Sequence, residues 1–304
     1  MNELIYDKRN GNVAFRESDH CYFDLRDPNK KYVSVTTCIH NYIEEFDSFF
    51  WSRYKALEAL TGLETFSSSG IKSVLLDKKV WSDTYASKCG IDPIEVHKEG
   101  MIIEEGYRKN SEAACAYGTA YHLQQELQFY KEKKDQTFNL EFFDKRFTKE
   151  YICIKDYYEL DIENGIYPEY LIYWEEDNLR ISGQIDLLIK EGNDIYLIDY
   201  KTNAKGIEEK SYYNHKTKSH KMMKYPVNSL MDCDKMHYTL QLSFYAKLLQ
   251  KINPEFKIKL LLLKHCSRDG VQTNIELEYL PGEVEKIIKD VKKKNYIEEQ
   301  RNKR

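Results

Sequence analysis

A segment of twenty residues near the middle of the chain, GQIDLLIKEGNDIYLIDYKT (183–202), constrains the fold more than any other. Two runs rich in Ile, Leu and Tyr, residues 181–190 and 194–200, have the composition of β-strands. Gly192 and Asn193 lie between them and supply the positive φ that a two-residue hairpin loop needs. The segment therefore predicts a half-buried antiparallel hairpin.

This hairpin carries acidic residues where apolar side chains would pack better. Counting back from the two loop residues, Asp186 lies directly opposite Asp199. Side chains alternate between the two faces of a strand, so Lys201 and its partner Gln184 share the face of Asp199. The predicted register thus brings two carboxylates and an ammonium group together on one face.

Two opposed carboxylates destabilise a hairpin unless something lies between them. Their Cβ atoms are about 4.5–5.5 Å apart, and the repulsion costs up to about 1 kcal/mol. A divalent cation converts the repulsion into coordination, and hard oxygen ligands favour Mg²⁺ or Mn²⁺ over zinc. The alternative is a pair of solvated aspartates on an exposed face.

The composition predicts a soluble globular protein. Of 304 residues, 41% are hydrophobic and 32% are charged, and the formal net charge is −4. A weakly negative chain gives no global sign of nucleic-acid binding, so any such surface must be a local patch. No apolar run approaches the roughly 20 residues of a membrane span. The first residues lack the apolar core of a signal peptide, so we expect no membrane association.

The seven cysteines are scattered, odd in number and without a CxxC pair. This pattern predicts reduced thiols and argues against a zinc or iron–sulfur site. Lys, Ile, Asn and Tyr are abundant, which is typical of AT-rich genomes such as those of many viruses. We therefore expect a cytoplasmic or other reducing intracellular setting, which includes a viral protein inside a host cell.

The first part of the chain predicts a small hairpin followed by helices. Residues 20–37 alternate around Pro28-Asn29, and residues 48–135 are mainly helical in pattern. The strongest helix is expected at 111–134, where apolar residues recur at steps of three and four. Its expected buried stripe consists of Ala116, Ala120, Leu123, Leu127 and Tyr130.

The remainder of the chain alternates strands and helices. Two strands after Pro168 lead into the hairpin, and an irregular stretch follows it up to about residue 234. A helix at 236–252 and a hairpin around Asp269-Gly270 come next, before a charged helix or tail. This order predicts an α/β fold with a helical N-terminal extension.

Four motifs occur in a recognisable order. GTAYH (118–122) precedes the G-x-I-D and I-D-Y-K-T elements of the hairpin, QLSFY (241–245) follows them, and VSVTT (33–37) lies near the start. Together they resemble the PD-(D/E)XK nuclease superfamily, specifically its RecB-like exonuclease branch, and are similar to phage and mitochondrial-genome-maintenance exonucleases. The resemblance extends from about residue 115 to 246.

The resemblance implies a restriction-endonuclease-like fold, with a mixed central sheet flanked by helices. It places a nuclease core at 111–282, after an N-terminal hairpin and helical extension at 1–110 and before a charged helix or tail at 283–304. The extension would be a clamp for DNA, or its aromatic residues would simply fill a helical core. Related nucleases that hold an iron–sulfur cluster use four cysteines around the core. The downstream three are absent here, so no cluster is expected.

By the same resemblance, the chain is a metal-dependent nuclease that hydrolyses phosphodiester bonds. Mg²⁺ or Mn²⁺ would stabilise charge on the phosphate and supply a hydroxide near neutral pH. Lys201 would orient or deprotonate the attacking water and offset charge in the transition state. The implied catalytic residues are Asp186, Asp199 and Lys201, and the implied metal ligands are His122, Asp186, Asp199, the carbonyl of Tyr200 and Glu169. Alternatively, His122 is a surface histidine and Glu169 only begins a strand.

Two further groups are expected to contact nucleic acid. Gln241 and Tyr245 share a helix face, and the resemblance implies that they line a nucleic-acid groove. Lys205, Lys216 and Lys218 lie in a segment rich in lysine and tyrosine (203–234), which suits phosphate contact and base stacking. A solvated flexible loop is an equally good reading of that segment.

The function expected from these features is a DNA exonuclease acting on single strands or duplex ends in replication, recombination or repair. Three alternatives stay open, namely an endonuclease or an RNA-directed nuclease on the same core, and a non-catalytic nucleic-acid-binding protein. No helicase motif occurs, which predicts a free-standing nuclease. The sequence identifies no protein partner.

Overall fold

The computed structural model describes residues 6–62, 81–130, 137–141, 144–154, 162–215 and 218–302. The chain divides into two compact units, the first made of Met1–Glu44 with Gly118–Arg304 and the second of Glu45–Tyr117. The N-terminal hairpins and the C-terminal helix both belong to the first unit, and the domain boundaries expected at residues 110 and 282 stay a prediction. None of the described helices has the length and apolar character needed to cross a bilayer.

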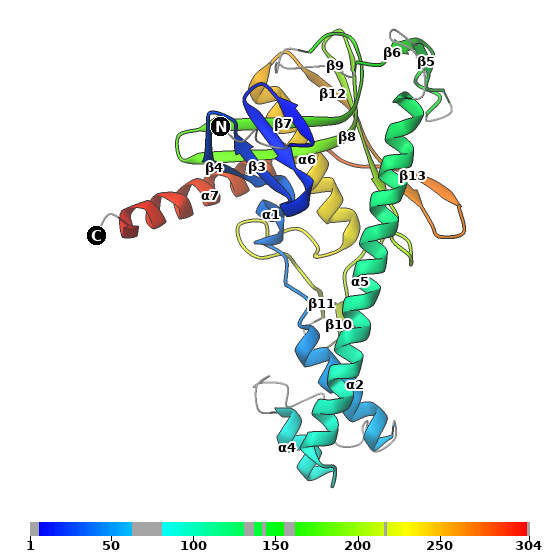
Figure 1. The fold of residues 1–304 in the computed structure, drawn as a ribbon, viewed down its shortest axis with the longest axis vertical. Coiled ribbons are helices and arrows are strands. Elements are labelled where there is room, and N and C mark those ends of the chain that lie inside the picture. The colour runs from blue at the N-terminus through cyan, green and yellow to red at the C-terminus, as the bar shows by residue number, and fades with distance from the viewer. Residues whose placement is uncertain are drawn as a thin grey trace. The chain divides into compact units, whose positions relative to one another are not determined.

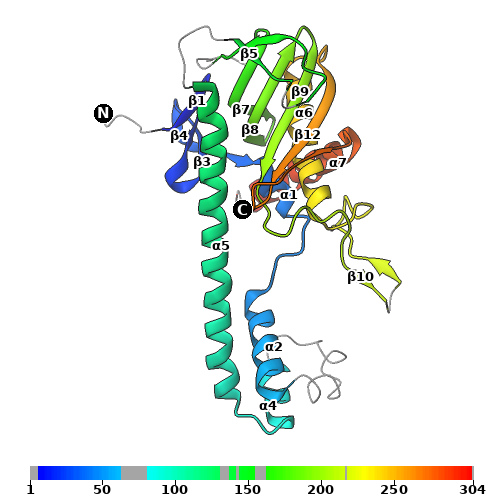
Figure 2. The same ribbon diagram turned by 90° about the vertical axis from the view of Figure 1, so that its right-hand side faces the viewer.

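A mixed β-sheet forms the centre of the first unit (Figures 1 and 2). Within the described residues its order is β1-β2-β3-β4-β8-β9-β12-β13, and β7 pairs with the other edge of β8. The pairs β4–β8 and β9–β12 are parallel, and the other pairs are antiparallel. The strands are β1 (Lys8–Asn10), β2 (Val13–Arg16), β3 (Cys21–Asp24), β4 (Asp27–Ser34), β7 (Gly165–Glu176), β8 (Leu179–Glu191), β9 (Asp194–Lys201), β12 (Lys257–Cys266) and β13 (Gln272–Glu276).

Helices cover both faces of this sheet. Leu197 of β9 joins an apolar cluster with α1 (Val35–His40), α6 (Asp234–Ile252) and α7 (Pro281–Asn302). The neighbouring Ile198 points the other way, into a cluster with Tyr121 and Phe129 of α5 (Pro93–Tyr130). This arrangement confirms the predicted restriction-endonuclease-like fold, a mixed central sheet flanked by helices.

The described part of the second unit is helical. It contains α2 (Ser48–Thr61), α4 (Trp81–Lys88) and the first part of α5. Phe50, Tyr54 and Leu57 of α2 are buried in a cluster with residues of the other two helices. The aromatic side chain of Tyr54 therefore fills a helical core, which is the plainer of the two expectations for this region, and the DNA clamp stays a prediction.

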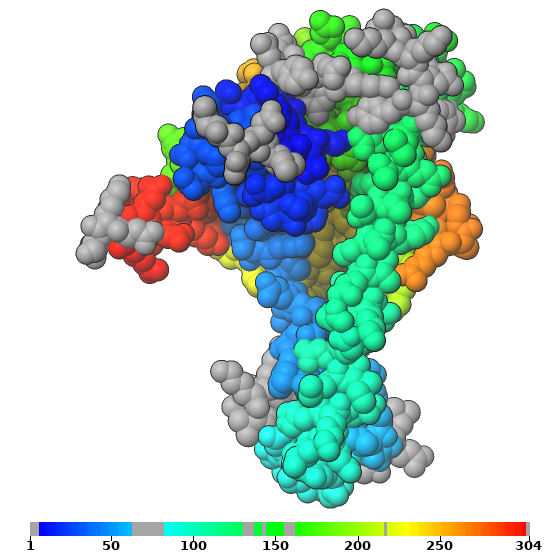
Figure 3. All heavy atoms as spheres, viewed as in Figure 1, coloured from blue at the N-terminus to red at the C-terminus, as the bar shows by residue number. Residues whose placement is uncertain are grey.

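Two pairs of short strands lie outside the main sheet. The strand β5 (Thr137–Asn139) pairs with β6 (Glu150–Ile152). The strand β10 (Tyr213–Asn214) pairs with β11 (Ser219–His220) inside the segment that was expected to be irregular. In Figure 3 the last turns of α7 (red) stand out from the body of the first unit, and Tyr296 there is 59% exposed.

The central hairpin has the predicted register. Glu191 pairs with Asp194 across the loop, and the pairing continues as far as Leu187 with Ile198. Gly192 has a φ of 58°, the left-handed conformation that favours glycine. The paired ladder ends one step before Asp186 and Asp199. A local turn thus fixes the register of two core strands, as the sequence predicts.

The small N-terminal hairpin turns earlier than predicted. Its turn lies at Leu25-Arg26, between β3 and β4, and Pro28-Asn29 falls within β4. The carboxylate of Asp24 accepts hydrogen bonds from the backbone N–H and the guanidinium group of Arg26 at 2.6–2.9 Å. An aspartate that bonds to the backbone two residues later stabilises a turn by itself, so no proline is required.

The prediction that an apolar stripe of α5 is buried is wrong. Leu123 and Leu127 are 52% and 41% exposed, and Ala116 and Ala120 are exposed too. The side chain of Tyr130 lies outside the described residues. Between residues 111 and 129 the buried side chains are the aromatic Tyr121 and Phe129, which remove more apolar area from water than the leucines would.

Candidate active site

The predicted site residues meet where the pairing partner of β8 changes from β4 to β9. On one edge, β8 pairs with β7 along its length. On the other edge, Ile181 and Ser182 pair with β4, whereas residues 187–191 pair with β9. Residues 183–186 therefore face a gap in the sheet, where the ladder is interrupted.

Asp186 lies at this gap and reaches across it. Its Oδ2 atom accepts a hydrogen bond of 2.7 Å from the backbone N–H of Tyr200 in β9. Glu169 occupies the facing position on β7, with a φ of 50°. A left-handed conformation in a residue other than glycine costs about 1–3 kcal/mol and is concentrated at functional sites.

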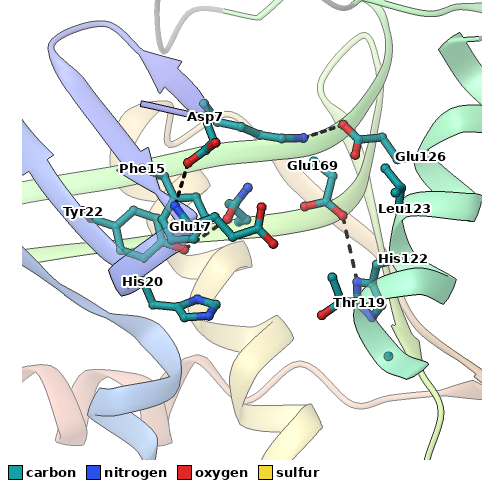
Figure 4. Close-up of a pocket in the computed structure, with 13 residues that line it drawn as sticks. Asp7, Phe15, Glu17, His20, Tyr22, Thr119, His122, Leu123, Glu126 and Glu169 are labelled. Atoms are coloured by element: carbon teal, nitrogen blue, oxygen red, sulfur yellow. Dashed lines mark hydrogen bonds and ion pairs between the residues drawn. The ribbon is translucent and has the colours of Figure 1, made fainter. Parts of the chain in front are cut away.

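His122, on α5, completes a cluster of potential metal ligands (Figure 4). Its Nδ1 atom lies 3.5 Å from Asp186 Oδ2 and 3.9 Å from Glu169 Oε1. Its Nε2 atom lies 2.9 Å from the carbonyl oxygen of Tyr200. One ligand atom from each of His122, Glu169 and Asp186 lies within 4.8 Å of the other two. The structure therefore brings together four of the five predicted ligands.

The charges and burial of this cluster favour the protonated forms of His122 and Glu169. Asp186 raises the pKa of His122 to about 9. Burial, with repulsion from Asp186, raises the pKa of Glu169. Burial alone would raise the pKa of Asp186 as well, but the His122 imidazolium lowers it. Without a cation, His122 and Glu169 therefore both hold a proton at neutral pH, and the imidazolium offsets the carboxylate of Asp186.

Asp199 makes a separate set of contacts. Its Oδ2 atom lies 2.6 Å from Lys201 Nζ, and its Oδ1 atom accepts a hydrogen bond of 3.1 Å from Gln241 Nε2 on α6. Burial raises the pKa of Asp199 to about 6. Burial alone would lower the pKa of Lys201, but Asp199 raises it. Lys201 and Asp199 share a face as predicted, whereas the role of Asp199 as a metal ligand stays a prediction.

Tyr245 lies under the sheet rather than on the surface. It is 3% exposed, and its hydroxyl group lies 3.4 Å from Gln241 Nε2. A Cβ atom on Gly183 would lie 2.6 Å from Tyr245 Cε1, which is closer than atoms can approach. The glycine of the G-x-I-D element therefore makes room for Tyr245, and Tyr245 supports Gln241 against Asp199.

The glycine of the GTAYH motif has a different environment. A Cβ atom on Gly118 would lie 3.5 Å from Thr202 Oγ1, an ordinary van der Waals distance. The packing of the sheet against α5 therefore does not require a glycine at this position.

The lysines of the segment 203–234 are expected to contact nucleic acid. Lys205 and Lys218 are exposed, and Lys216 lies outside the described residues. Tyr212 and Tyr225 in the same segment are 73% and 77% exposed. The segment therefore presents cationic and aromatic side chains to solvent, and its role in nucleic-acid binding stays a prediction.

The N-terminal strands were missed as part of the site. Phe15, Tyr22 and neighbouring side chains line a cavity of about 380 Å³ together with His122 and Glu169 (Figure 4). Val33 of β4 pairs with Ile181 of β8, almost 150 residues further along the chain. No local pattern signals such a pairing, since alternation identifies a strand but not its neighbour.

Comparison with known proteins agrees with the geometry of this site. The family model of the PD-(D/E)XK nuclease superfamily matches residues 96–302, which is more than half of the chain. No curated protein and no solved structure matches the chain. The matched range contains the ligand cluster, the Asp199–Lys201 pair and the QLSFY helix. The chain belongs to the PD-(D/E)XK nuclease superfamily.

Proposed function

We propose that the protein is a divalent-metal-dependent DNA exonuclease of the RecB-like branch, acting in replication, recombination or repair. The observation that carries this proposal is the cluster of His122, Glu169 and Asp186, with ligand atoms within 4.8 Å of one another, at a gap in the sheet. The carbonyl of Tyr200 and the Asp199–Lys201 ion pair adjoin it. The family membership supports nuclease chemistry in general, and the four ordered motifs support the branch.

The donor set fits a hard divalent cation. Two carboxylates, a carbonyl oxygen and one imidazole suit Mg²⁺ or Mn²⁺ better than a soft metal, which prefers thiolates. The side chains of Glu169 and Asp186 are 15% and 9% exposed, so the charge of a cation would be weakly screened there. A bound cation supplies positive charge for the scissile phosphate and makes water more acidic near neutral pH.

The residues around the cation would position the reacting groups. Lys201 would place a positive charge beside the phosphate and orient the attacking water. Asp199 fixes the Lys201 ammonium at 2.6 Å, and the ring of Tyr238 lies 4.9 Å from the same nitrogen. Gln241 holds the other carboxylate oxygen of Asp199. These contacts would preorganise the lysine before the substrate binds.

DNA would be held beyond the cluster by the exposed side chains of residues 203–234. Lys205 and Lys218 would contact phosphates, and the exposed rings of Tyr212 and Tyr225 would stack on bases. Gln241 would act next to the scissile phosphate, whereas the buried Tyr245 would act through Gln241.

Cleavage of labelled DNA tests this proposal. We expect Mn²⁺ or Mg²⁺ to support degradation of linear single strands or duplex ends, and we expect a chelator to abolish it. A covalently closed circle should resist cleavage. Cutting of the circle would favour an endonuclease, and preference for matched RNA would favour an RNA-directed nuclease. DNA binding without cleavage of any substrate would contradict the proposal.

A further inference from the structure

The cavity beside the ligand cluster extends away from it between two walls (Figure 4). One wall is α5, which contributes His122 and Thr119, and the other is made by the N-terminal strands β2 and β3 with the turn between them. Its volume of about 380 Å³ is within the range of small-ligand sites, which starts at about 300 Å³. The N-terminal wall lies outside the range 96–302 that the family model matches. The wall is therefore a feature of this chain beyond the matched core.

Aromatic rings dominate the N-terminal wall. Phe15 and Tyr22 face each other across β2 and β3, with ring centroids 4.7 Å apart. The His20 ring lies 5.9 Å from that of Phe15. His20 has a φ of 49°, a left-handed conformation that the turn imposes and that carries its ring toward the cavity. Leu123 lines the opposite side and is 52% exposed. Phe15 and Tyr22 are each 8% exposed whereas His20 is exposed, so the cavity offers a planar apolar ligand mainly the His20 ring on one side and an aliphatic group on the other.

The polar groups of the cavity are mostly acidic. Asp7, Glu17 and Glu126 line it in addition to Glu169. Lys8 is the one lysine or arginine among the described residues that line it, and Glu126 pairs with it at 2.5 Å. Such a lining disfavours a phosphate away from His122, because Lys8 is already paired with Glu126. Carboxylates instead accept hydrogen bonds from the amino groups of nucleobases.

An amide group adds to this complementarity. Gln184, at the gap in the sheet, accepts a hydrogen bond of 3.5 Å from the hydroxyl group of Tyr22. Carboxamides pair with the edges of bases through one donor and one acceptor. Gly118 also lines the cavity and places no side chain in it.

We propose that this cavity binds the base of the nucleotide next to the scissile phosphate. The base would stack against Phe15 and His20, while the phosphate would lie at the cluster of His122, Glu169 and Asp186. This inference rests on the proposed nuclease function and deepens it, since the cavity would bind the base and thereby position the strand for cleavage. Stacking on aromatic side chains tolerates every base, so the pocket would measure the presence of a base more than its identity.

Cleavage of a substrate that lacks one base tests the proposal. We expect wild-type protein to cut about 10-fold more slowly when the nucleotide next to the cut is abasic, which is the effect expected for one stacked base. An abasic nucleotide further along the strand should have little effect. The variant His20→Asn removes an exposed ring at a position where asparagine tolerates positive φ. In this variant, the ratio of the cleavage rate of the intact substrate to that of the abasic substrate should fall from about 10 toward one.

Two more variants separate stacking from folding. Phe15→Leu removes the second ring but keeps an apolar side chain, and its thermal unfolding reports whether the strands still pack. Tyr296→Asn is the matched control, because it removes an exposed aromatic ring of α7. It should leave the ratio unchanged. An equal ratio in wild type, His20→Asn and Phe15→Leu, or no effect of the missing base in wild type, would overturn the proposal.

A binding measurement keeps the test independent of catalysis. An oligonucleotide ending in the fluorescent base 2-aminopurine is titrated with protein in the presence of Ca²⁺, and stacking quenches its fluorescence. We expect quenching with wild type and Tyr296→Asn, and less with His20→Asn. No quenching with wild type contradicts the base pocket, whatever the cleavage result. Quenching without cleavage of any substrate contradicts the nuclease proposal and leaves the base pocket supported.

Discussion

The Nε2 atom of His122 lies 2.9 Å from the carbonyl oxygen of Tyr200, so a helix side chain reaches the backbone of a central strand. The contact joins two residues that are 78 positions apart in the sequence. The other ring nitrogen of His122, Nδ1, faces the carboxylates of Asp186 and Glu169. In the absence of a cation, the protonated imidazole therefore bridges the same groups that a cation would join.

Metal affinity should consequently depend on pH. Asp186 raises the pKa of His122 to about 9, and only the neutral imidazole binds a metal. Below pH 9 each bound cation must displace this proton, and below about pH 8 it must also displace one from Glu169, whose pKa burial raises to about 8, so affinity should rise by more than about 10-fold between pH 7 and 8. Calorimetry in two buffers of different ionisation enthalpy counts the released protons. In His122→Ala, the affinity should be weaker and its pH slope smaller. A wild-type affinity that does not change with pH would argue against His122 as a ligand.

Lys201 should affect catalysis and stability in different ways. In Lys201→Met, Asp199 is left buried without its partner, which costs about 3 kcal/mol of folding free energy. The double variant Lys201→Met with Asp199→Asn should regain most of that stability, because it removes the buried charge. In both variants we expect the cleavage rate to be at least about 100-fold lower than that of wild type. Denaturant unfolding and cleavage rates measure the two effects, and a double variant with near wild-type activity would exclude the proposed role of Lys201.

Gly183 should tolerate no side chain because of Tyr245. In Gly183→Ala the new Cβ atom would lie 2.6 Å from Tyr245 Cε1, and relief of the clash should cost about 1–3 kcal/mol. The displaced ring would also loosen the support of Gln241, so cleavage should slow. The second variant Tyr245→Leu, added to Gly183→Ala, should recover stability but not cleavage. Gly118→Ala is the matched control for stability, since its Cβ atom has room and alanine favours a helix by about 1 kcal/mol. Equal stability of Gly183→Ala and wild type would show that the contact is not tight.

The exposed lysines of residues 203–234 should contribute salt-dependent DNA affinity. Lys205→Ala and Lys218→Ala should each weaken binding and lower the slope of log affinity against log salt by about 1. Lys289→Ala, an exposed lysine of α7, is the control and should leave the slope unchanged. Fluorescence anisotropy at several salt concentrations gives both quantities. Slopes equal to that of wild type would place the DNA elsewhere.

The hairpin could be predicted because its information is local. Gly192 adopts the positive φ that the loop requires, and the loop then sets the register as far as Leu187 and Ile198. The position of His122 came only from the resemblance of its motif to known nucleases. Tertiary contact, not the spacing of apolar residues, decides which face of α5 is buried, and Leu123 and Leu127 are therefore exposed.

The neighbours of the hairpin could not be predicted in the same way. Glu169 faces Asp186 because β7 and β8 pair along their length, and its left-handed φ interrupts the regular strand. The N-terminal wall of the cavity depends on the pairing of Val33 with Ile181. Both arrangements arise from long-range pairing, which leaves no period or turn signal in the sequence.

The location of a bound cation shows most directly whether His122, Glu169 and Asp186 form the metal site. Crystals of the protein soaked in Mn²⁺ would give an anomalous difference peak at the cation, independent of any assumption about the reaction. We expect one strong peak among His122, Glu169 and Asp186, within bonding distance of at least two of them. A peak elsewhere in the protein, with no density at these three side chains under conditions that support cleavage, would contradict it.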